Sequence, residues 1–398
     1  MLRNYLGDEA FFKALGVYLK ARSFKSAEVQ DLRLAFEEVS GRDLNWYFNQ
    51  WYYGAGHPIL DITYNWDEAT KTEKVFVAQN QQGQIFQLPI AVDVYVGGKT
   101  ERHQVWLSHV KDTLSFKTAA RPDLINVDAE KILLTNKTDH KTLAELAFQY
   151  QHAPLYMDRL EAFVAAADQQ STAEGKYILT AALKDKYHGL RIKAIRAIKV
   201  DNQAFVTAVL PIMADLAKND PNYPVRAAAL KLLGKINSLV YKNLYVASLS
   251  SPSYGVRGAA LTALNSIAPD QAFKTAKELQ PQAEGPFAQA IVAVYATNGA
   301  DPEWPYVIAA FKRASVQVKV DNAIQSLPQI IGRMANRAYV TEGINSIRDL
   351  AIAYKKYGIA SRLIASLEEI SKQRKKSNDD DSAKIANEAI KQINDAKA

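Results

Sequence analysis

Histidine is the side chain that most often binds a catalytic metal or moves a proton in an enzyme, and this chain of 398 residues has six. The residues that follow them are Pro, Gln, Val, Lys, Ala and Gly, so none starts the motif His-Glu-x-x-His, which places two zinc ligands on one helix face. His103 and His109 are six positions apart in a predicted strand region, where even spacing puts side chains on one face. No carboxylate cluster accompanies them, and we interpret both as surface residues. The six are His57, His103, His109, His140, His152 and His188.

The sequence also lacks the common nucleophilic and phosphate-binding motifs. It contains no cysteine, which excludes a thiol nucleophile and a cysteine zinc site, and no Gly-x-Ser-x-Gly elbow. Gly98-Lys99-Thr100 has the ending of a phosphate-binding loop, but Asp93 stands where the first glycine of that motif belongs, and the tract reads as a hairpin turn rather than the start of a helix. We therefore predict no catalytic, cofactor-binding or metal-binding residue in this chain.

Charge is distributed unevenly between the two ends of the chain. Residues 1–135 hold 15 Lys and Arg against 17 Asp and Glu, so residues 136–398 hold 34 against 25 and carry a net charge of +9. A nucleic-acid site normally clusters its basic residues, whereas the dense run here, Lys372 to Lys376, is followed at once by Asp379-Asp380-Asp381. We favour a solvated helix end over a nucleic-acid site. No apolar run approaches the roughly 20 residues of a membrane span.

Residues 1–55 have the periodicity of short amphipathic helices. Gly7 is predicted to end a first helix and Asp8 to cap the second, with Phe11, Phe12 and Leu15 on its buried stripe. A third helix is predicted from about Ala27 to Val39, and a fourth from Asp43. The fourth is crowded with aromatic side chains that need burial against a partner: Trp46, Tyr47, Phe48, Trp51, Tyr52 and Tyr53.

Residues 56–135 change from helical to alternating periodicity. Leu60, Ile62, Tyr64 and Trp66 alternate with polar residues, which predicts a half-buried strand. A longer alternation over 86–96 leads to Gly97-Gly98, a predicted two-residue hairpin turn, and then to a returning strand. Several short strands with turn signals predict a small antiparallel β-sandwich.

Residues 136–398 are predicted to be helical, in segments broken by Pro, Gly or Asp/Asn. Three segments align closely, beginning at Leu190-Arg191, Val225-Arg226 and Val256-Arg257, and Met157 to Phe163 fits less well. This pattern resembles HEAT-like repeats, in which paired helices stack as a solenoid. An arginine at the same helical position in each repeat is interpreted as structural rather than as a ligand contact. The predicted fold class is therefore mainly α with a small all-β domain.

The first two segments together resemble the gluzincin zinc aminopeptidases of the aminopeptidase N type. The resemblance covers the end of their thermolysin-like catalytic domain, and it implies a following β-sandwich and a HEAT-like helical domain. The blocks that carry it are Met1-Leu2-Arg3, Leu6 to Phe12, Asp31-Leu32, Ala35 to Gly41, Asp43-Leu44, Phe48, Gln50-Trp51 and Gly56 to Leu60.

The resemblance also implies why no catalytic motif is found. In the family, the segment that binds the substrate amino group, the His-Glu-x-x-His motif and the remaining zinc ligand all precede this stretch. We therefore expect a full-length zinc enzyme that removes N-terminal residues from peptides, and we expect this part to be inactive alone and to supply the sandwich and a helical lid or wall of the substrate cavity. The partners implied are the N-terminal catalytic domain and, in the full enzyme, peptide; no nucleic-acid partner is expected.

Two questions stay open at this point. A stand-alone helical-repeat scaffold that binds protein partners is the alternative function, although such a scaffold has no reason to begin with an aromatic-rich half-domain. The hydrophobic residues Leu2, Tyr5, Leu6, Phe11 and Phe12 are expected to be exposed, to pair with another copy or to fold back on the sandwich. Localisation is not predicted, because any export signal would lie upstream of Met1. The sequence makes no prediction of oligomeric state.

Overall fold

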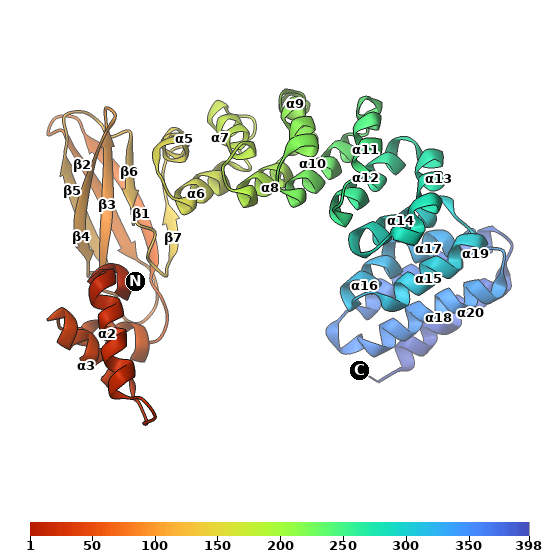
Figure 1. Ribbon diagram of the computed structural model, residues 1–398, viewed down its shortest axis with the longest axis horizontal. Coiled ribbons are helices and arrows are strands. Elements are labelled where there is room, and N and C mark those ends of the chain that lie inside the picture. The colour runs from red at the N-terminus through yellow and green to blue at the C-terminus, as the bar shows by residue number, and fades with distance from the viewer. Residues whose placement is uncertain (398) are drawn as a thin grey trace. The chain divides into compact units, whose positions relative to one another are not determined.

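The computed structural model describes residues 1–397, which form two compact units (Figure 1). The first unit comprises Met1–Ala182 and the second begins at Leu183. The predicted fold class, mainly helical with a small all-β part, is confirmed. The sequence analysis divided the chain after residues 55 and 135, where the predicted secondary structure changes. These two positions stay predictions as domain boundaries.

The chain opens with four short helices and a π-helical turn. Gly7, at φ 80°, joins the first two helices and takes the N-cap position that the sequence assigned to Asp8. Asp8 is instead the first helical residue, and its carboxylate accepts a 2.8 Å hydrogen bond from Arg3. Gly41 ends the third helix in the left-handed conformation that favours glycine. The elements are α1 (Leu2–Leu6), α2 (Asp8–Ala21), α3 (Val29–Ser40), α4 (Asn45–Phe48) and the turn η1 (Asn49–Tyr53).

These helices build a small core of their own and then contact the sandwich. Ala14, Phe36, Leu44 and Phe48 are buried at its centre. Leu2, Tyr5, Leu6 and Phe11 pack around them, so these four lie against the helical segment itself, whereas Phe12 is 54% exposed. The structure thus divides the three expected outcomes among these residues, and Tyr5 is the one whose ring contacts the sandwich. The rings of Tyr5 and Trp46 both pack against Trp106 of the sandwich, at centroid distances of 6.0 and 5.3 Å.

Seven strands form the two sheets of the sandwich. One sheet has the order β5-β2-β1-β7 and the other β4-β3-β6. The predicted turn at Gly97-Gly98 is present, with positive φ at both glycines, and joins β3 to β4. The strands are β1 (Ile59–Asp67), β2 (Thr72–Gln79), β3 (Leu88–Val96), β4 (Lys99–Leu107), β5 (Lys111–Lys117), β6 (Leu124–Val127) and β7 (Asn136–Asp139).

Strand β7 departs from the sequence prediction in two ways. It lies past residue 135, where the sandwich was predicted to end, and it pairs parallel to β1 in a sandwich predicted to be antiparallel. Its sequence Asn-Lys-Thr-Asp has no apolar alternation, so periodicity could not reveal it. The strand exists because β1 offers an unpaired edge, with Ile59 opposite Asn136.

Three helices follow the sandwich: α5 (Leu143–His152), α6 (Tyr156–Ala166) and α7 (Ala173–Leu183). A buried ionic network ties the sandwich to α6. Lys131 Nζ lies 3.1 Å from carboxylate oxygens of both Asp158 and Glu161 on α6. Glu161 also pairs with Lys137 of β7 at 2.9 Å. Because charges removed from water are costly unless they are paired, each member of this network holds the others in place.

The network also perturbs the pKa values of its members. Burial would raise the pKa of Glu161 and of Asp139, but the surrounding lysines outweigh it and lower both. Burial would likewise lower the pKa of Lys131, but Glu161 and Asp158 outweigh it and raise that pKa. The folded state thus favours the charged form of all three groups.

We predict that acid unfolds this unit through Glu161 and Asp139. Their lowered pKa values contribute stability that is present above the ordinary carboxyl values of 4.5 and 3.8 and is lost as pH falls through the folded-state values. Glu161→Gln should lower the free energy of unfolding by about 2–4 kcal/mol at neutral pH, since it leaves buried lysines underpaired. It should also flatten the decline below pH 4.5. Urea titrations across pH measure both effects, with Glu38→Gln on an exposed position of α3 as the control.

The second unit is entirely helical among its described residues. Figure 1 shows its helices following one another as stacked pairs. They are α8 (His188–Ala197), α9 (Gln203–Asn219), α10 (Tyr223–Ile236), α11 (Lys242–Ser248), α12 (Tyr254–Ile267), α13 (Pro269–Leu279), α14 (Gly285–Asn298), α15 (Trp304–Arg313), α16 (Val316–Gln325), α17 (Leu327–Ile331), α18 (Arg337–Ala353), α19 (Ala360–Lys376) and α20 (Asp380–Asp395), with short turns η2 (Leu239–Tyr241), η3 (Gln280–Gln282), η4 (Asp301–Glu303) and η5 (Lys355–Tyr357).

Glycines set the spacing between successive helices of this unit. α10 packs on α12 and α12 on α14. A Cβ at Gly234 would lie 2.8 Å from that of Ala263, and one at Gly258 would lie 2.7 Å from the carbonyl oxygen of Pro286. These helices approach so closely because no side chain separates them at those points.

We predict that Gly258→Ala destabilises the protein by about 1–3 kcal/mol, because the new methyl group meets a backbone carbonyl that cannot rotate away. Gly255→Ala is the matched control on the same helix, since its Cβ would meet only Ser253 Oγ at 3.6 Å. That variant should be neutral or slightly more stable. Chemical denaturation of both variants measures the difference, and equal stabilities would contradict the role given to Gly258.

Among the described residues, no helix is both long and apolar enough to cross a membrane.

Candidate functional site

The histidines lie apart from one another and make separate local contacts. His103 lies on β4, and its ring packs 4.9 Å from that of Phe116. His109 lies beyond the end of β4, so the two do not share a strand face, and its Nδ1 is 2.8 Å from Asp112. Within residues 1–397, no group of three or more His, Cys, Asp or Glu side chains is placed to hold a metal ion.

The repeated arginines occupy equivalent positions but have different partners. Arg191 makes two hydrogen bonds to the carboxylate of Asp220, at 2.8 and 2.9 Å. Arg226 donates to the carbonyl oxygen of Ala217 at 3.3 Å, and Arg257 lies 4.2 Å above the ring of Phe287. The contacts bridge neighbouring helices, which is what a structural residue does in a stacked repeat.

The basic run at 372–376 ends α19 and has two parts. Lys372, Lys375 and Lys376 are exposed, as expected of a solvated helix end. Arg374 is buried, and it donates to the carbonyl oxygens of Ile331 and Met334, the second at 2.8 Å. The run is therefore no continuous basic stripe, because its central arginine is used inside the fold.

Residues 1–55 leave a second feature, a set of large apolar side chains in contact with solvent. We call it the exposed apolar set. Phe24 and Leu19 are the most exposed members, and the tyrosines of η1 belong to it as well. Its members are Phe12, Leu19, Phe24, Leu34, Tyr52 and Tyr53, each more than half exposed. Six such side chains in so short a segment are more than the scattered single exposures that are ordinary on a protein surface.

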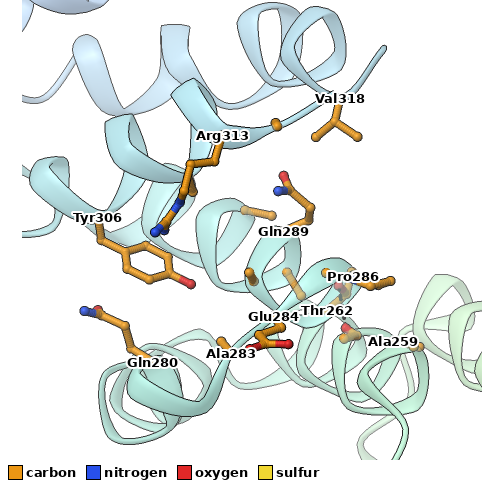
Figure 2. Close-up of a pocket in the computed structure, with 18 of the residues that line it drawn as sticks. Ala259, Thr262, Gln280, Ala283, Glu284, Pro286, Gln289, Tyr306, Arg313 and Val318 are labelled. Carbon is orange, nitrogen blue, oxygen red and sulfur yellow. Dashed lines mark hydrogen bonds between the residues drawn. The ribbon is translucent and has the colours of Figure 1, made fainter. Parts of the chain in front are cut away.

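The second unit contains a groove of about 1080 Å³. It is lined by residues of α10, α12, α14, α15 and α16 and of the turn η3, some of which Figure 2 labels, and half of the lining residues are glycine or alanine. The close helix approach at Gly258 and the loop between α13 and α14 create its floor. The groove is larger than most small-molecule clefts and open to solvent, so it has room for a segment of chain.

The polar side chains of the groove are mostly hydrogen-bond donors. Gln280 Oε1 accepts a 2.6 Å hydrogen bond from Tyr295, and Gln289 Oε1 accepts one of 2.9 Å from Asn322. These bonds leave the two amide nitrogens free to donate, since neither has a partner among residues 1–397. Arg313 likewise has no carboxylate partner in the described part of the chain.

Tyr306 and Arg313 form one end of the groove. Figure 2 shows the guanidinium of Arg313 pointing toward the tyrosine. Burial raises the pKa of Tyr306, and the charge of Arg313 opposes that shift, so the two groups interact electrostatically. The Tyr306 ring also packs edge-on against Tyr295 at 5.7 Å, which fixes its position.

Sequence patterns did not reveal this groove. Its lining residues come from five α-helices, the turn η3 and the loops between them, and no short motif joins them. The one local signal is the tract Gln280 to Pro286, where proline and glycine interrupt the helical repeat.

Comparison with known proteins identifies the repeats first. The HEAT repeat model matches residues 209–240, within the predicted repeat region. Aminopeptidase N of Lactococcus lactis is 29% identical over 92 residues, 23% of this chain and 11% of that protein. Aminopeptidase N of Haemophilus influenzae is 35% identical over 80 residues, 20% of this chain and 9% of that protein.

A solved structure extends the likeness to nearly the whole chain. Aminopeptidase A of Legionella pneumophila, in complex with aspartic acid, superposes on 97% of this chain and 55% of its own length, with a TM-score of 0.57 and 13% identity. These likenesses support the assignment of this chain to a C-terminal portion of an aminopeptidase of the aminopeptidase N type. The matched stretches span about a tenth of the first curated relatives.

We predict that Arg191, the arginine of the first of the three closely aligned segments, stabilises the fold. Arg191→Gln should lower the free energy of unfolding by about 2–4 kcal/mol, because it leaves the nearly buried Asp220 carboxylate unpaired. Arg196→Gln, an exposed position of the same helix, is the control and should change it by less than about 0.5 kcal/mol. Equal unfolding midpoints for the two variants would contradict the structural interpretation.

Proposed function

We propose that this chain is the non-catalytic, C-terminal part of a zinc-dependent aminopeptidase that removes N-terminal residues from peptides. The observation that carries the proposal is the order of the parts. A short helical segment with the aminopeptidase motifs is followed by a sandwich and a HEAT-like helical unit, and a solved aminopeptidase matches this order over 97% of the chain.

The chemistry of the proposed enzyme belongs to residues outside this chain. Zinc would act there as a Lewis acid toward a bound water. The described residues do not fit such an ion, because they hold no cluster of three ligand side chains, and His140 and His109 are engaged with separate carboxylates at 2.9 and 2.8 Å. We therefore derive no catalytic step within this chain.

The exposed apolar set is the surface that we assign to the catalytic domain. The motifs in residues 1–55 resemble the end of that domain, and the set lies on α2, α3 and the turns beside them. Each large apolar side chain gains about 1.5–3 kcal/mol when it is removed from water. A protein-binding scaffold could also use such a surface, so it is the aminopeptidase motifs of residues 1–55 and the order of the parts that disfavour the alternative function.

The helical unit is proposed to form a wall or lid of the substrate cavity. Its basic balance, +9 over residues 136–398, favours the approach of a peptide through its carboxylate groups. The groove of Figure 2 is where we expect a peptide carboxylate to bind, because the polar groups of the groove are mostly hydrogen-bond donors. The competing interpretation is that the charge only keeps the protein in solution.

We predict that this chain alone neither binds stoichiometric zinc nor hydrolyses an alanyl p-nitroanilide, and that adding the zinc-bearing portion of the same enzyme yields activity. Leu19→Asp in the exposed apolar set should weaken that association about tenfold or more, because one buried side chain is lost. Lys13→Asp, an exposed polar position on the same helix, is the matched control.

Two results would contradict the proposed function. Turnover with bound zinc by this chain alone would show that the catalytic site is present in it. A coding sequence that reaches a stop codon immediately before Met1, instead of continuing into His-Glu-x-x-His, would remove the proposed catalytic partner.

A further inference from the structure

The groove of the second unit combines small lining residues with hydrogen-bond donors and positive charge. A wall that only enclosed a cavity would not need this combination. The floor of the groove is formed by residues with little or no side chain, such as Gly255, Gly258 and Ala259, so a ligand backbone can lie close to the helices. Its lining includes one acidic residue, Glu284, and two basic ones, Lys231 and Arg313. A surface of this kind favours a ligand that is rich in acceptors and carries a negative charge.

The two glutamines of the groove, Gln280 and Gln289, present their amide nitrogens rather than their oxygens to a ligand. Each has its carbonyl oxygen held by an internal hydrogen bond, Gln280 by Tyr295 and Gln289 by Asn322. The amide nitrogens are thus the groups left for a ligand, and they match the carbonyl oxygens of an extended peptide. An extended chain presents such oxygens whatever its sequence.

Arg313 provides the charge at the end of the groove. It is exposed, it lies beside Tyr306, and no carboxylate of the described chain pairs with it. A guanidinium can bind both oxygens of one carboxylate, and the tyrosine hydroxyl can add a third hydrogen bond. The groove therefore offers one strong anchor for a carboxylate beside weaker anchors for backbone.

We propose that this groove binds the C-terminal end of a peptide, with the terminal carboxylate on Arg313 and Tyr306 and backbone carbonyl oxygens on Gln280 and Gln289. The choice of the terminal carboxylate rests on the proposed function. An enzyme that acts on the N-terminus of many peptides needs an anchor present in all of them, and the terminal carboxylate is that group, whereas an acidic side chain is not.

The test measures binding to this chain without catalysis. An N-terminally labelled octapeptide of Ala, Ser and Gly, prepared as the C-terminal acid and as the C-terminal amide, is titrated by fluorescence anisotropy at low salt. We expect the acid to bind about tenfold more tightly than the amide, which is the size of one charge-assisted hydrogen-bond pair at a partly exposed site. The ratio should decrease as salt is added.

Three variants locate the effect. Arg313→Gln should bring the acid-to-amide ratio close to one, while Arg196→Gln, an exposed arginine outside the groove, should leave the ratio unchanged. Thr262→Trp fills the floor without changing charge and should weaken both peptides. Circular dichroism and the melting temperature of each variant show whether it is folded.

Several outcomes would overturn the inference. They are equal affinity for acid and amide, no saturable binding of either, or a ratio that survives Arg313→Gln. An amidated peptide with one internal Glu that binds as tightly as the acid would replace terminal recognition by side-chain recognition. A failed assay of the assembled enzyme would contradict the proposed function instead, and it would leave these binding ratios as they are.

Discussion

Close approach between successive helices is the constraint on which the second unit depends. A helix pair in a stacked repeat buries its apolar face only against its neighbours, so the spacing between pairs decides whether a continuous core forms. Gly234 and Gly258 set that spacing at two consecutive contacts, where any side chain would meet Ala263 or the backbone of Pro286. The same absence of side chains leaves the smooth floor of the groove. One packing requirement thus yields both the core and the hollow beside it.

In the first unit, the helices of residues 1–55 are too few to bury all of their own aromatic residues. Trp46 and Tyr5 reach the sandwich at Trp106, and Lys131 ties the sandwich to Asp158 of α6. The first contact is apolar and tolerant of geometry. The second is ionic, buried and dependent on every partner. The sandwich is therefore fixed on one side by packing and on the other by charge.

These arrangements fit the proposal that this chain supplies binding surfaces, whereas the catalytic residues lie outside it. The described residues contain no metal-ligand cluster, yet they keep two kinds of unused surface, one apolar in residues 1–55 and one donor-rich between α12 and α15. An apolar surface suits a permanent protein partner, because exposing it to water whenever the partner leaves costs free energy. A donor-rich groove suits a ligand that enters and leaves, because water can replace each hydrogen bond.

The sequence determined the elements, since periodicity depends on neighbours along the chain. It predicted the helices of residues 1–55, the Gly97-Gly98 hairpin, and repeats headed by Arg191, Arg226 and Arg257, and the family resemblance came from local motifs. Tertiary structure decided what depends on distant segments. Strand β7 exists because of the edge of β1, Arg374 donates to a carbonyl group 40 residues away, and the groove joins residues from five helices. None of these leaves a periodic trace, because the contact that defines each one is made only when the chain folds.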